Sequence, residues 1–223
     1  MKNLFKVLGG GLFLCVIVLL IVQAFNFPGS KGLSKFFSYF RSSMVATVFT
    51  PATADVLVDV TAATSTCATA GFTFNTNCFS TVQAGINAAT VGQTVGVEAG
   101  TYTGPVTINK RISLIGAGNS QTIITGGSPV LTLAATGILG NPILLKNFQV
   151  KGFSAIYTGT SSISYVEFDG LLVAAITYGS GYGFRILFGN SVDHLTVTNC
   201  IFENFYAGWY VERKPGSGYR DTV

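Results

Sequence analysis

Charged residues are scarce in this sequence. The 223 residues include 13 Lys or Arg and 9 Asp or Glu, together 10% of the chain, against a usual fraction of about 25%. Hydrophobic residues make up 48%, and glycine occupies 27 positions. This balance excludes a disordered chain and a coiled coil, which both depend on many more charged side chains. We therefore expect a folded chain.

The greater part of the chain also lacks an excess of positive charge. Residues 1–54 contain five Lys or Arg and no acid, whereas residues 55–223 contain eight Lys or Arg and nine Asp or Glu. The formal net charge of +4 therefore comes from the N-terminal segment alone. Because residues 55–223 carry no basic field, we expect no nucleic-acid partner.

The N-terminal segment contains a long uncharged run from Val7 to Ser30, preceded by two lysines. A secretory signal has an apolar stretch of about 7–15 residues and a spanning helix about 17–25. We expect residues 1–30 to be a signal-anchor or signal peptide that enters the membrane through residues 7–25. The alternative is a longer leader that is cleaved after Ala54. Either way, the rest of the chain lies outside the cytoplasmic membrane, anchored or secreted.

Residues 31–54 are expected to form an amphipathic juxtamembrane linker. Their apolar side chains recur at helical spacing beside basic ones: Leu33, Phe36, Phe37, Phe40 and Met44. The alternative is a helix that packs on the folded domain, which we place at residues 55–223.

Cysteine and histidine are too few for a metal centre. In an exported chain, Cys67 and Cys78 predict a disulfide that closes a ten-residue loop, which would contribute about 2–3 kcal/mol. Cys200 lies in an apolar strand pattern and is interpreted as a small core residue. His194 is the only histidine, so no zinc-type ligand set is present. We expect no cofactor; calcium is possible, but no motif indicates it.

Residues 55–223 read as short apolar runs separated by Gly, Asn, Ser and Thr. One short helix is predicted near residues 82–89, with Ser80 as N-cap, Gln83 completing a capping box and Gly92 ending it. All other runs predict strands, among them 94–98, 106–109, 143–150, 163–168 and 195–197. Because no helices separate the strands, a doubly wound α/β sheet is excluded.

A weak internal repeat favours a solenoid. The segment Lys146–Phe153 aligns with Thr198–Phe205 at an offset of 52 residues, which equals two coils of 26. In both segments an asparagine is followed by apolar residues at positions +1, +3 and +6. Coils of about 20–26 residues suit a parallel β-helix, with apolar side chains stacked inward and Asn or Gly at the bends.

The segment Phe79–Gly118 resembles the N-terminal signature of the pectin-lyase-like superfamily. The similar elements are Ser80–Ala89, Val91–Val97, Gly100–Gly104, Val106–Lys110 and Ile112–Gly118. The segment Val192–Asn204 is similar to the later coils of the same superfamily, so the resemblance covers about 150 residues. It implies an all-β right-handed parallel β-helix whose N-terminal end is capped by a short helix. The opening is most similar to that of the pectinesterases. The resemblance is specific for the fold and weak for activity.

The catalytic motifs of these relatives have no counterpart here. Pectinesterases carry an acidic residue two positions after the tyrosine of the Gly-x-Tyr element, where this chain has Gly104. Their Gln-Asp-Thr and Asp-Phe-x-Phe-Gly segments are missing, and Val192–His194 only faintly resembles the Asp-His element of the lyases. Whether residues 55–223 are an enzyme is therefore left open.

Elementary chemistry leaves a few candidate site residues. Glu167 and Asp169 are expected on the outer face of one strand, about 6–7 Å apart, as a carboxylate pair, a cation-binding spot or an ordinary solvated face. Asp193 and His194 would make an acid–base pair, but neighbours on a strand point to opposite faces, so a polar bend is the alternative. The aromatic candidates for sugar stacking, or for core positions, are Tyr206, Trp209 and Tyr210.

These features predict a surface module that binds polysaccharide or cell-surface material. The alternative is a pectinesterase- or lyase-type enzyme with its catalytic coils beyond residue 223. The residues from Tyr219 onward read as the start of another strand, so the β-helix is expected to be incomplete at Val223. An open strand edge there also predicts end-to-end self-association.

Overall fold

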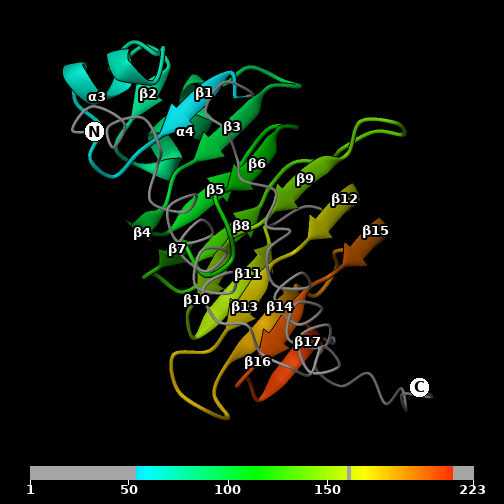
Figure 1. The fold of residues 1–223 in the computed structure, drawn as a ribbon. Coiled ribbons are helices and arrows are strands. Elements are labelled where there is room, and N and C mark those ends of the chain that lie inside the picture. The colour runs from blue at the N-terminus through cyan, green and yellow to red at the C-terminus, as the bar shows by residue number, and fades with distance from the viewer. Residues whose placement is uncertain (1–53, 160–161, 213–223) are drawn as a thin grey trace, which may run out of the picture. The chain divides into compact units, whose positions relative to one another are not determined.

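The computed structural model describes residues 54–159 and 162–212. Their strands wind into a parallel β-solenoid of about six turns, as predicted. Figure 1 shows the strands stacked in order along the solenoid, from β1 near one end to β17 at the other. From β3 onward each turn contributes one strand to each of three sheets, so a strand inside a sheet pairs with the equivalent strands one turn before and one turn after it; β1 and β2 extend the first sheet only.

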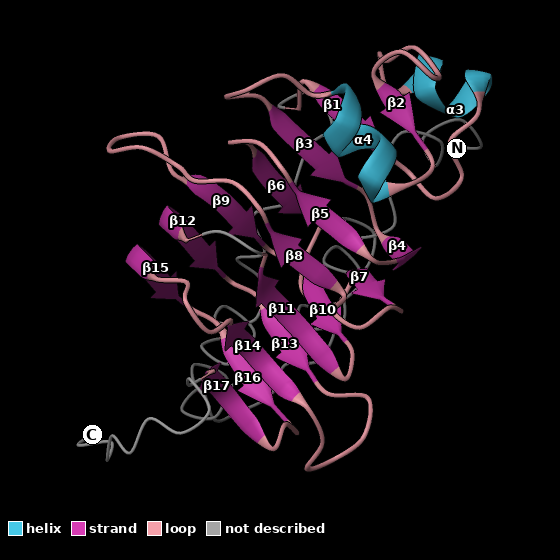
Figure 2. Ribbon diagram, turned by 180° about the vertical axis from the view of Figure 1, so that it is seen from behind, coloured by secondary structure: helices cyan, strands magenta, loops and turns pink. Residues whose placement is uncertain are grey.

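The three sheets contain parallel strands only. The first, here called sheet A, has the spatial order β15-β12-β9-β6-β3-β1-β2, with bounds β1 Val56–Val58, β2 Cys78–Phe79, β3 Thr94–Val97, β6 Ser113–Gly116, β9 Ile143–Lys146, β12 Ile163–Asp169 and β15 Val192–Thr198. Sheet B comprises β4 Gly100–Thr103, β7 Thr122–Thr125, β10 Gln149–Lys151, β13 Leu172–Ala174 and β16 Ile201–Glu203. Sheet C comprises β5 Val106–Ile108, β8 Leu131–Leu133, β11 Ser154–Thr158, β14 Tyr182–Ile186 and β17 Ala207–Val211. Figure 2 shows the same stack from behind.

The core consists of columns of apolar side chains that run along the solenoid. Strand pairing places equivalent side chains directly above one another, so each inward position repeats from turn to turn. In sheet A the column is Val56, Val95, Leu114, Leu145, Phe168 and Val197. In sheet B it is Tyr102, Ile124, Val150, Val173 and Phe202. In sheet C it is Val106, Leu131, Ile156, Phe184 and Trp209.

The repeat predicted from the sequence is confirmed, but its coils are unequal. Lys146 pairs with Asp169, and Asp169 with Thr198, so the two coils are 23 and 29 residues long and together span 52. The prediction of two coils of 26 was wrong because the loops differ in length. The apolar positions +1 and +3 face inward as expected, whereas Phe153 at +6 is 55% exposed.

Asparagine and glycine turn the chain between sheets A and B. The stacked positions Asn147, Gly170 and Asn199 have φ angles of 57°, 67° and 54°, in the left-handed region that asparagine and glycine adopt most readily. The turn at Asn147 divides the strand predicted for residues 143–150 into β9 and β10. The short strands β1, β2, β4, β11 and β13 were not predicted.

Helix α4 (Val82–Ala88) packs against β1, β3 and β5 at the N-terminal end of the solenoid. The predicted N-cap Ser80 is wrong: Thr81 caps the helix, and its hydroxyl accepts a hydrogen bond from the amide of Ala84 at 3.3 Å. The predicted role of Gln83 is wrong too. Its side-chain oxygen accepts from the backbone N–H of Thr107 at 2.7 Å, which ties the helix to β5 instead of capping it.

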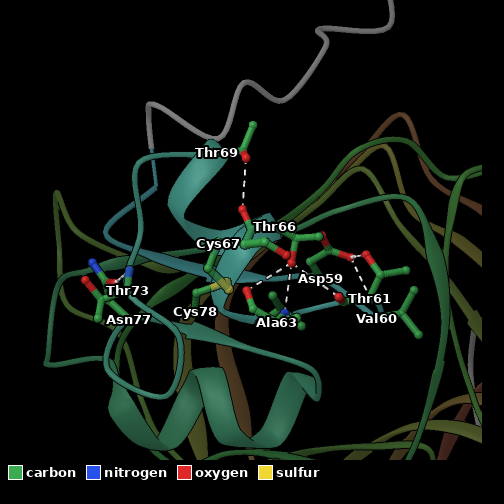
Figure 3. Close-up of a disulfide and its surroundings, with 12 residues drawn as sticks. Asp59, Val60, Thr61, Ala63, Thr66, Cys67, Thr69, Thr73, Asn77 and Cys78 are labelled. Atoms are coloured by element: carbon green, nitrogen blue, oxygen red, sulfur yellow. Dashed lines mark hydrogen bonds between the residues drawn. A yellow bond between two sulfur atoms is a disulfide. The ribbon is translucent and has the colours of Figure 1, made fainter.

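The predicted disulfide is present between Cys67 and Cys78 (Figure 3). Cys67 lies in helix α3 (Thr64–Thr69) and Cys78 in β2, the edge strand of sheet A. Both cysteines are buried with Leu57 in a small apolar cluster. The bridge therefore holds the α3 segment against the end of sheet A.

Several predictions fall on residues outside the described ranges: the leader 1–30 with its membrane segment 7–25, the linker before residue 54 and the strand expected from Tyr219. Within residues 54–159 and 162–212, the structure contains no helix long and apolar enough to cross a bilayer.

Candidate functional site

The outer face of sheet C carries a column of aromatic and basic side chains. Register aligns Tyr157 of β11 with Arg185 of β14, and Arg185 with Tyr210 of β17. The guanidinium carbon of Arg185 lies 5.7 Å from the ring centre of Tyr157 and 5.6 Å from that of Tyr182. Both distances are within the range of a cation–π interaction. The strands therefore hold these side chains in fixed positions.

Two further ring contacts extend this column. Tyr182 stacks on Tyr210, with ring centres 4.3 Å apart and an interplanar angle of 22°. The ring of Tyr206 meets Tyr182 edge-on, at 6.4 Å. In the stacked pair each ring covers one face of the other.

Arg185 is also anchored by an ion pair. Its guanidinium nitrogen lies 2.9 Å from a carboxylate oxygen of Glu212. The other oxygen accepts from the backbone N–H of Phe188 at 3.3 Å. These two hydrogen bonds, the one from Arg185 foremost, lower the pKa of Glu212. Arg185 is thus a largely neutralised cation within the aromatic column.

Two loops beside sheet C present highly exposed tyrosines. Tyr178, in the loop between β13 and β14, is 87% exposed, and Tyr206, before β17, is 76% exposed. The backbone N–H of Gly179 donates to the carbonyl of Asn204 at 2.7 Å, so the two loops run side by side. We call Tyr157, Tyr178, Tyr182, Tyr206 and Tyr210 the aromatic surface.

The three aromatic residues predicted as candidates separate in the structure. Tyr206 and Tyr210 belong to the aromatic surface, whereas Trp209 occupies the last position of the inward column of sheet C. Its ring packs edge-on against Phe184 at 5.0 Å and lies 5.4 Å from Phe202. Trp209 is therefore a core side chain, although 46% of it is exposed in the last described turn.

Glu167 and Asp169 both lie on the outer face of β12, with Phe168 buried between them. Asp169 is held in a network across three turns. Its carboxylate pairs with Lys146 at 2.7 Å and accepts from Asn199 at 2.9 Å and Thr198 at 3.2 Å. These contacts, with the Lys146 hydrogen bond foremost, lower the pKa of Asp169. The carboxylate of Asp169 therefore links neighbouring turns of sheet A.

Asp193 and His194 meet, contrary to the expectation that neighbours on a strand point apart. Nδ1 of His194 lies 2.8 Å from a carboxylate oxygen of Asp193. The reason is a local break in the strand: His194 has a φ of 51°, which turns its side chain to the same face. Its ring stacks at 4.3 Å on Tyr165 of the preceding turn. Both members of the pair are more than half exposed.

The remaining candidates concern sulfur and metals. Cys200 is partly buried against the core, as predicted, and burial raises the pKa of its thiol. Within the part of the chain that the structure describes, no three His, Cys, Asp or Glu side chains are grouped so that they could hold a metal ion.

Most of the aromatic surface escaped sequence reasoning. Tyr157 lies in β11, whereas Tyr182 and Arg185 lie in β14 one turn later, and only the strand register shows that these side chains are neighbours. The 52-residue offset does not reveal them either. It aligns Tyr157 with Trp209, whereas the strand register aligns Tyr157 with Tyr210.

Comparisons of the chain with models of protein families, with curated proteins and with solved structures found no match.

Proposed function

We propose that the chain is an extracytoplasmic β-solenoid module that binds polysaccharide or carbohydrate-rich cell-surface material through the aromatic surface of sheet C. The observation that carries the proposal is the group of tyrosines on the strands of sheet C, next to the loop residues Tyr178 and Tyr206, which are largely open to solvent. Aromatic rings offer a large contact area at low cost in conformational entropy, and their hydroxyls supply hydrogen bonds. Sugar rings combine apolar C–H faces with hydroxyl groups and fit such a surface.

Further features support the same proposal. The disulfide favours an oxidising compartment, as does the apolar run in residues 7–25. The resemblance of Phe79–Gly118 to the pectin-lyase-like superfamily supports a right-handed β-helix, and many proteins with that fold act on polysaccharides. The scarcity of charge favours ligands bound by stacking and hydrogen bonds over ligands bound by charge alone.

The test uses the full chain, purified in mild detergent and incubated with neutral and uronic-acid polysaccharides, with and without calcium. The bound fraction is measured by co-sedimentation or affinity electrophoresis. The double variant Tyr178→Ala/Tyr206→Ala should bind at least about tenfold more weakly, because each ring contributes about 1 kcal/mol. Phe188→Ala, which removes an exposed ring outside the aromatic surface, is the matched control and should bind normally.

The same incubation addresses the enzymatic alternative. Absorbance of unsaturated products and release of methanol are followed together with binding. Binding without turnover supports the module. Turnover that is lost in Glu167→Gln or Asp193→Asn would replace it with an enzyme whose site lies in these turns, and equal binding by the double variant would refute the role of the aromatic surface.

A further inference from the structure

A groove of about 260 Å³ lies on the outer face of sheet A, on a different sheet from the aromatic surface. Its floor is formed by Tyr165 and Glu167 of β12 and by His194 and Thr196 of β15, and Glu167 and Thr196 are paired in register. Its wall is the loop between β8 and β9, with Ile138 and Leu139 at its tip. This loop projects from the stack of strands in both views (Figures 1 and 2).

The wall exists because β9 does not run the full length of β12. The pairing of β9 with β12 begins at Ile143 and Val166, so the first residues of β12 have no strand neighbour on that side. The loop takes that place. The backbone N–H of Gly137 donates to the carbonyl of Ser164 at 2.8 Å, and a Cβ at Gly137 would collide with the carbonyl oxygen of Tyr165. Glycine is therefore required for this close approach.

The floor is shaped by a left-handed residue at the same position of two successive turns. Tyr165 and His194 have φ angles of 50° and 51°, a left-handed conformation that costs a residue other than glycine free energy and that clusters at functional sites. This local conformation turns both rings to the outer face, where they stack at 4.3 Å with an interplanar angle of 13° and line the groove.

The groove combines apolar walls with negative charge. Leu139 is 82% exposed and Ile138 52% exposed, and no Lys or Arg is among the described residues that line the groove. Glu167 makes no ion pair within the described part of the chain. The neighbouring Lys146 is bound to Asp169, so it does not neutralise Glu167. A second carboxylate, that of Asp193, lies behind His194 at 2.8 Å.

We propose that this groove binds an organic ammonium ion with an apolar body. The body would lie between the Leu139 tip and the stacked rings of Tyr165 and His194, and the ammonium group would donate hydrogen bonds to the carboxylate of Glu167. A carboxylate beside aromatic rings is a suitable environment for such a cation. Amino sugars and simple alkylamines both present this chemistry. The proposal is independent of the proposed function, because it concerns another sheet.

The single histidine of the chain makes the test specific. The full chain is prepared in detergent with ¹³C-labelled histidine and no histidine tag, and the imidazole signal of His194 is followed during titration with cyclohexylammonium. Cyclohexanol, which has the same ring without the charge, is titrated in parallel. We expect a saturable shift with the ammonium ion and at least tenfold weaker binding of the alcohol.

Three variants locate the ligand. Glu167→Gln should raise the dissociation constant for cyclohexylammonium at least about fivefold, because it removes a charge-assisted hydrogen bond. Glu203→Gln, on the outer face of β16, is the matched control and should bind normally. Leu139→Ser changes an exposed loop tip that does not support the core, so it should fold normally and still bind more weakly.

The proposal is refuted by a shift that does not saturate, by equal binding of the alcohol, or by unchanged binding in both Glu167→Gln and Leu139→Ser. Glucosamine oligomers and their N-acetylated forms distinguish the sources: tighter binding of the free amino form than of cyclohexylammonium assigns an amino sugar, and the reverse order assigns an alkylamine. The double variant Tyr178→Ala/Tyr206→Ala should bind cyclohexylammonium as the wild type does, as followed by the His194 signal. This result would separate the groove from the aromatic surface.

Discussion

The hydroxyl of Tyr102 offers the sharpest test of how the solenoid is held together. Tyr102 heads the inward column of sheet B and is 3% exposed. Its hydroxyl oxygen accepts from the backbone N–H of Val60 at 3.2 Å and lies within donating distance of the carbonyls of Glu98, at 3.1 Å, and Val58, at 3.3 Å. Burial, as the main cause, raises the pKa of this phenol above its ordinary value.

Replacing Tyr102 with Phe keeps the ring in the core but leaves these backbone groups without their partner. A buried polar group that loses its hydrogen bond costs about 1–3 kcal/mol. In a domain of this size, about 2 kcal/mol lowers the melting temperature by about 4–8 °C. Thermal unfolding of the full chain in detergent, followed by circular dichroism, measures the change.

The matched control is Tyr206→Phe, which removes a hydroxyl from a ring that is 76% exposed and should change stability by less than about 0.5 kcal/mol. A melting temperature of Tyr102→Phe within about 1 °C of the wild type would be far below the expected decrease of about 4–8 °C. The hydroxyl would then not hold the first turn against β1, and the reasoning would fail.

Three further predictions concern stability. Replacing both Cys67 and Cys78 with Ser should cost about 2–3 kcal/mol, because the unfolded loop is no longer closed; the variant should melt like the reduced wild type, and an unchanged melting temperature would contradict this. Burial, followed by the charge of Asp59, raises the pKa of Glu98. The folded state therefore binds a proton at Glu98 more tightly than the unfolded state, which stabilises the fold at low pH. This stability is lost as the pH rises through the pKa of the folded state. Glu98→Gln should therefore stabilise the fold at pH 7 but not at pH 3, and equal effects at both would refute it. The pKa of Asp169 is lowered, so the stability contributed by its charged form is present above the unfolded pKa and is lost as the pH falls through the folded pKa. Asp169→Asn should therefore cost up to about 1 kcal/mol of folding stability at pH 7 and little at pH 2. Thermal melting at both pH values measures the difference.

The fold could be predicted because its signals are local and repeated. Short apolar runs, glycine and asparagine at bends and the 52-residue offset all follow from what one turn of a solenoid needs. The offset survived although the coils are unequal, because extra residues enter loops and leave the inward columns unchanged. The disulfide was predictable because Cys67 and Cys78 lie only 11 positions apart.

The details of the helix cap depended on tertiary contacts. Ser80 and Gln83 match the spacing of a capping box, but the side-chain oxygen of Gln83 accepts a hydrogen bond from the backbone N–H of Thr107 in β5 instead. The cap then moves to Thr81, whose hydroxyl reaches the amide of Ala84. A local pattern does not show which partner a long polar side chain will find in the neighbouring turn.

The candidate sites show the same division. Sequence spacing placed Glu167 and Asp169 on one face correctly, because strand residues alternate. It failed for His194 because the left-handed φ of that residue interrupts the alternation. It also did not separate Trp209 from Tyr210, since the direction of each side chain depends on the register with the preceding turn. The sequence by itself therefore determined that the chain is a parallel solenoid with a disulfide near its start. Only the tertiary structure decided which side chains meet on its outer faces, because those neighbours lie a full turn apart in the chain and are joined by loops of unequal length.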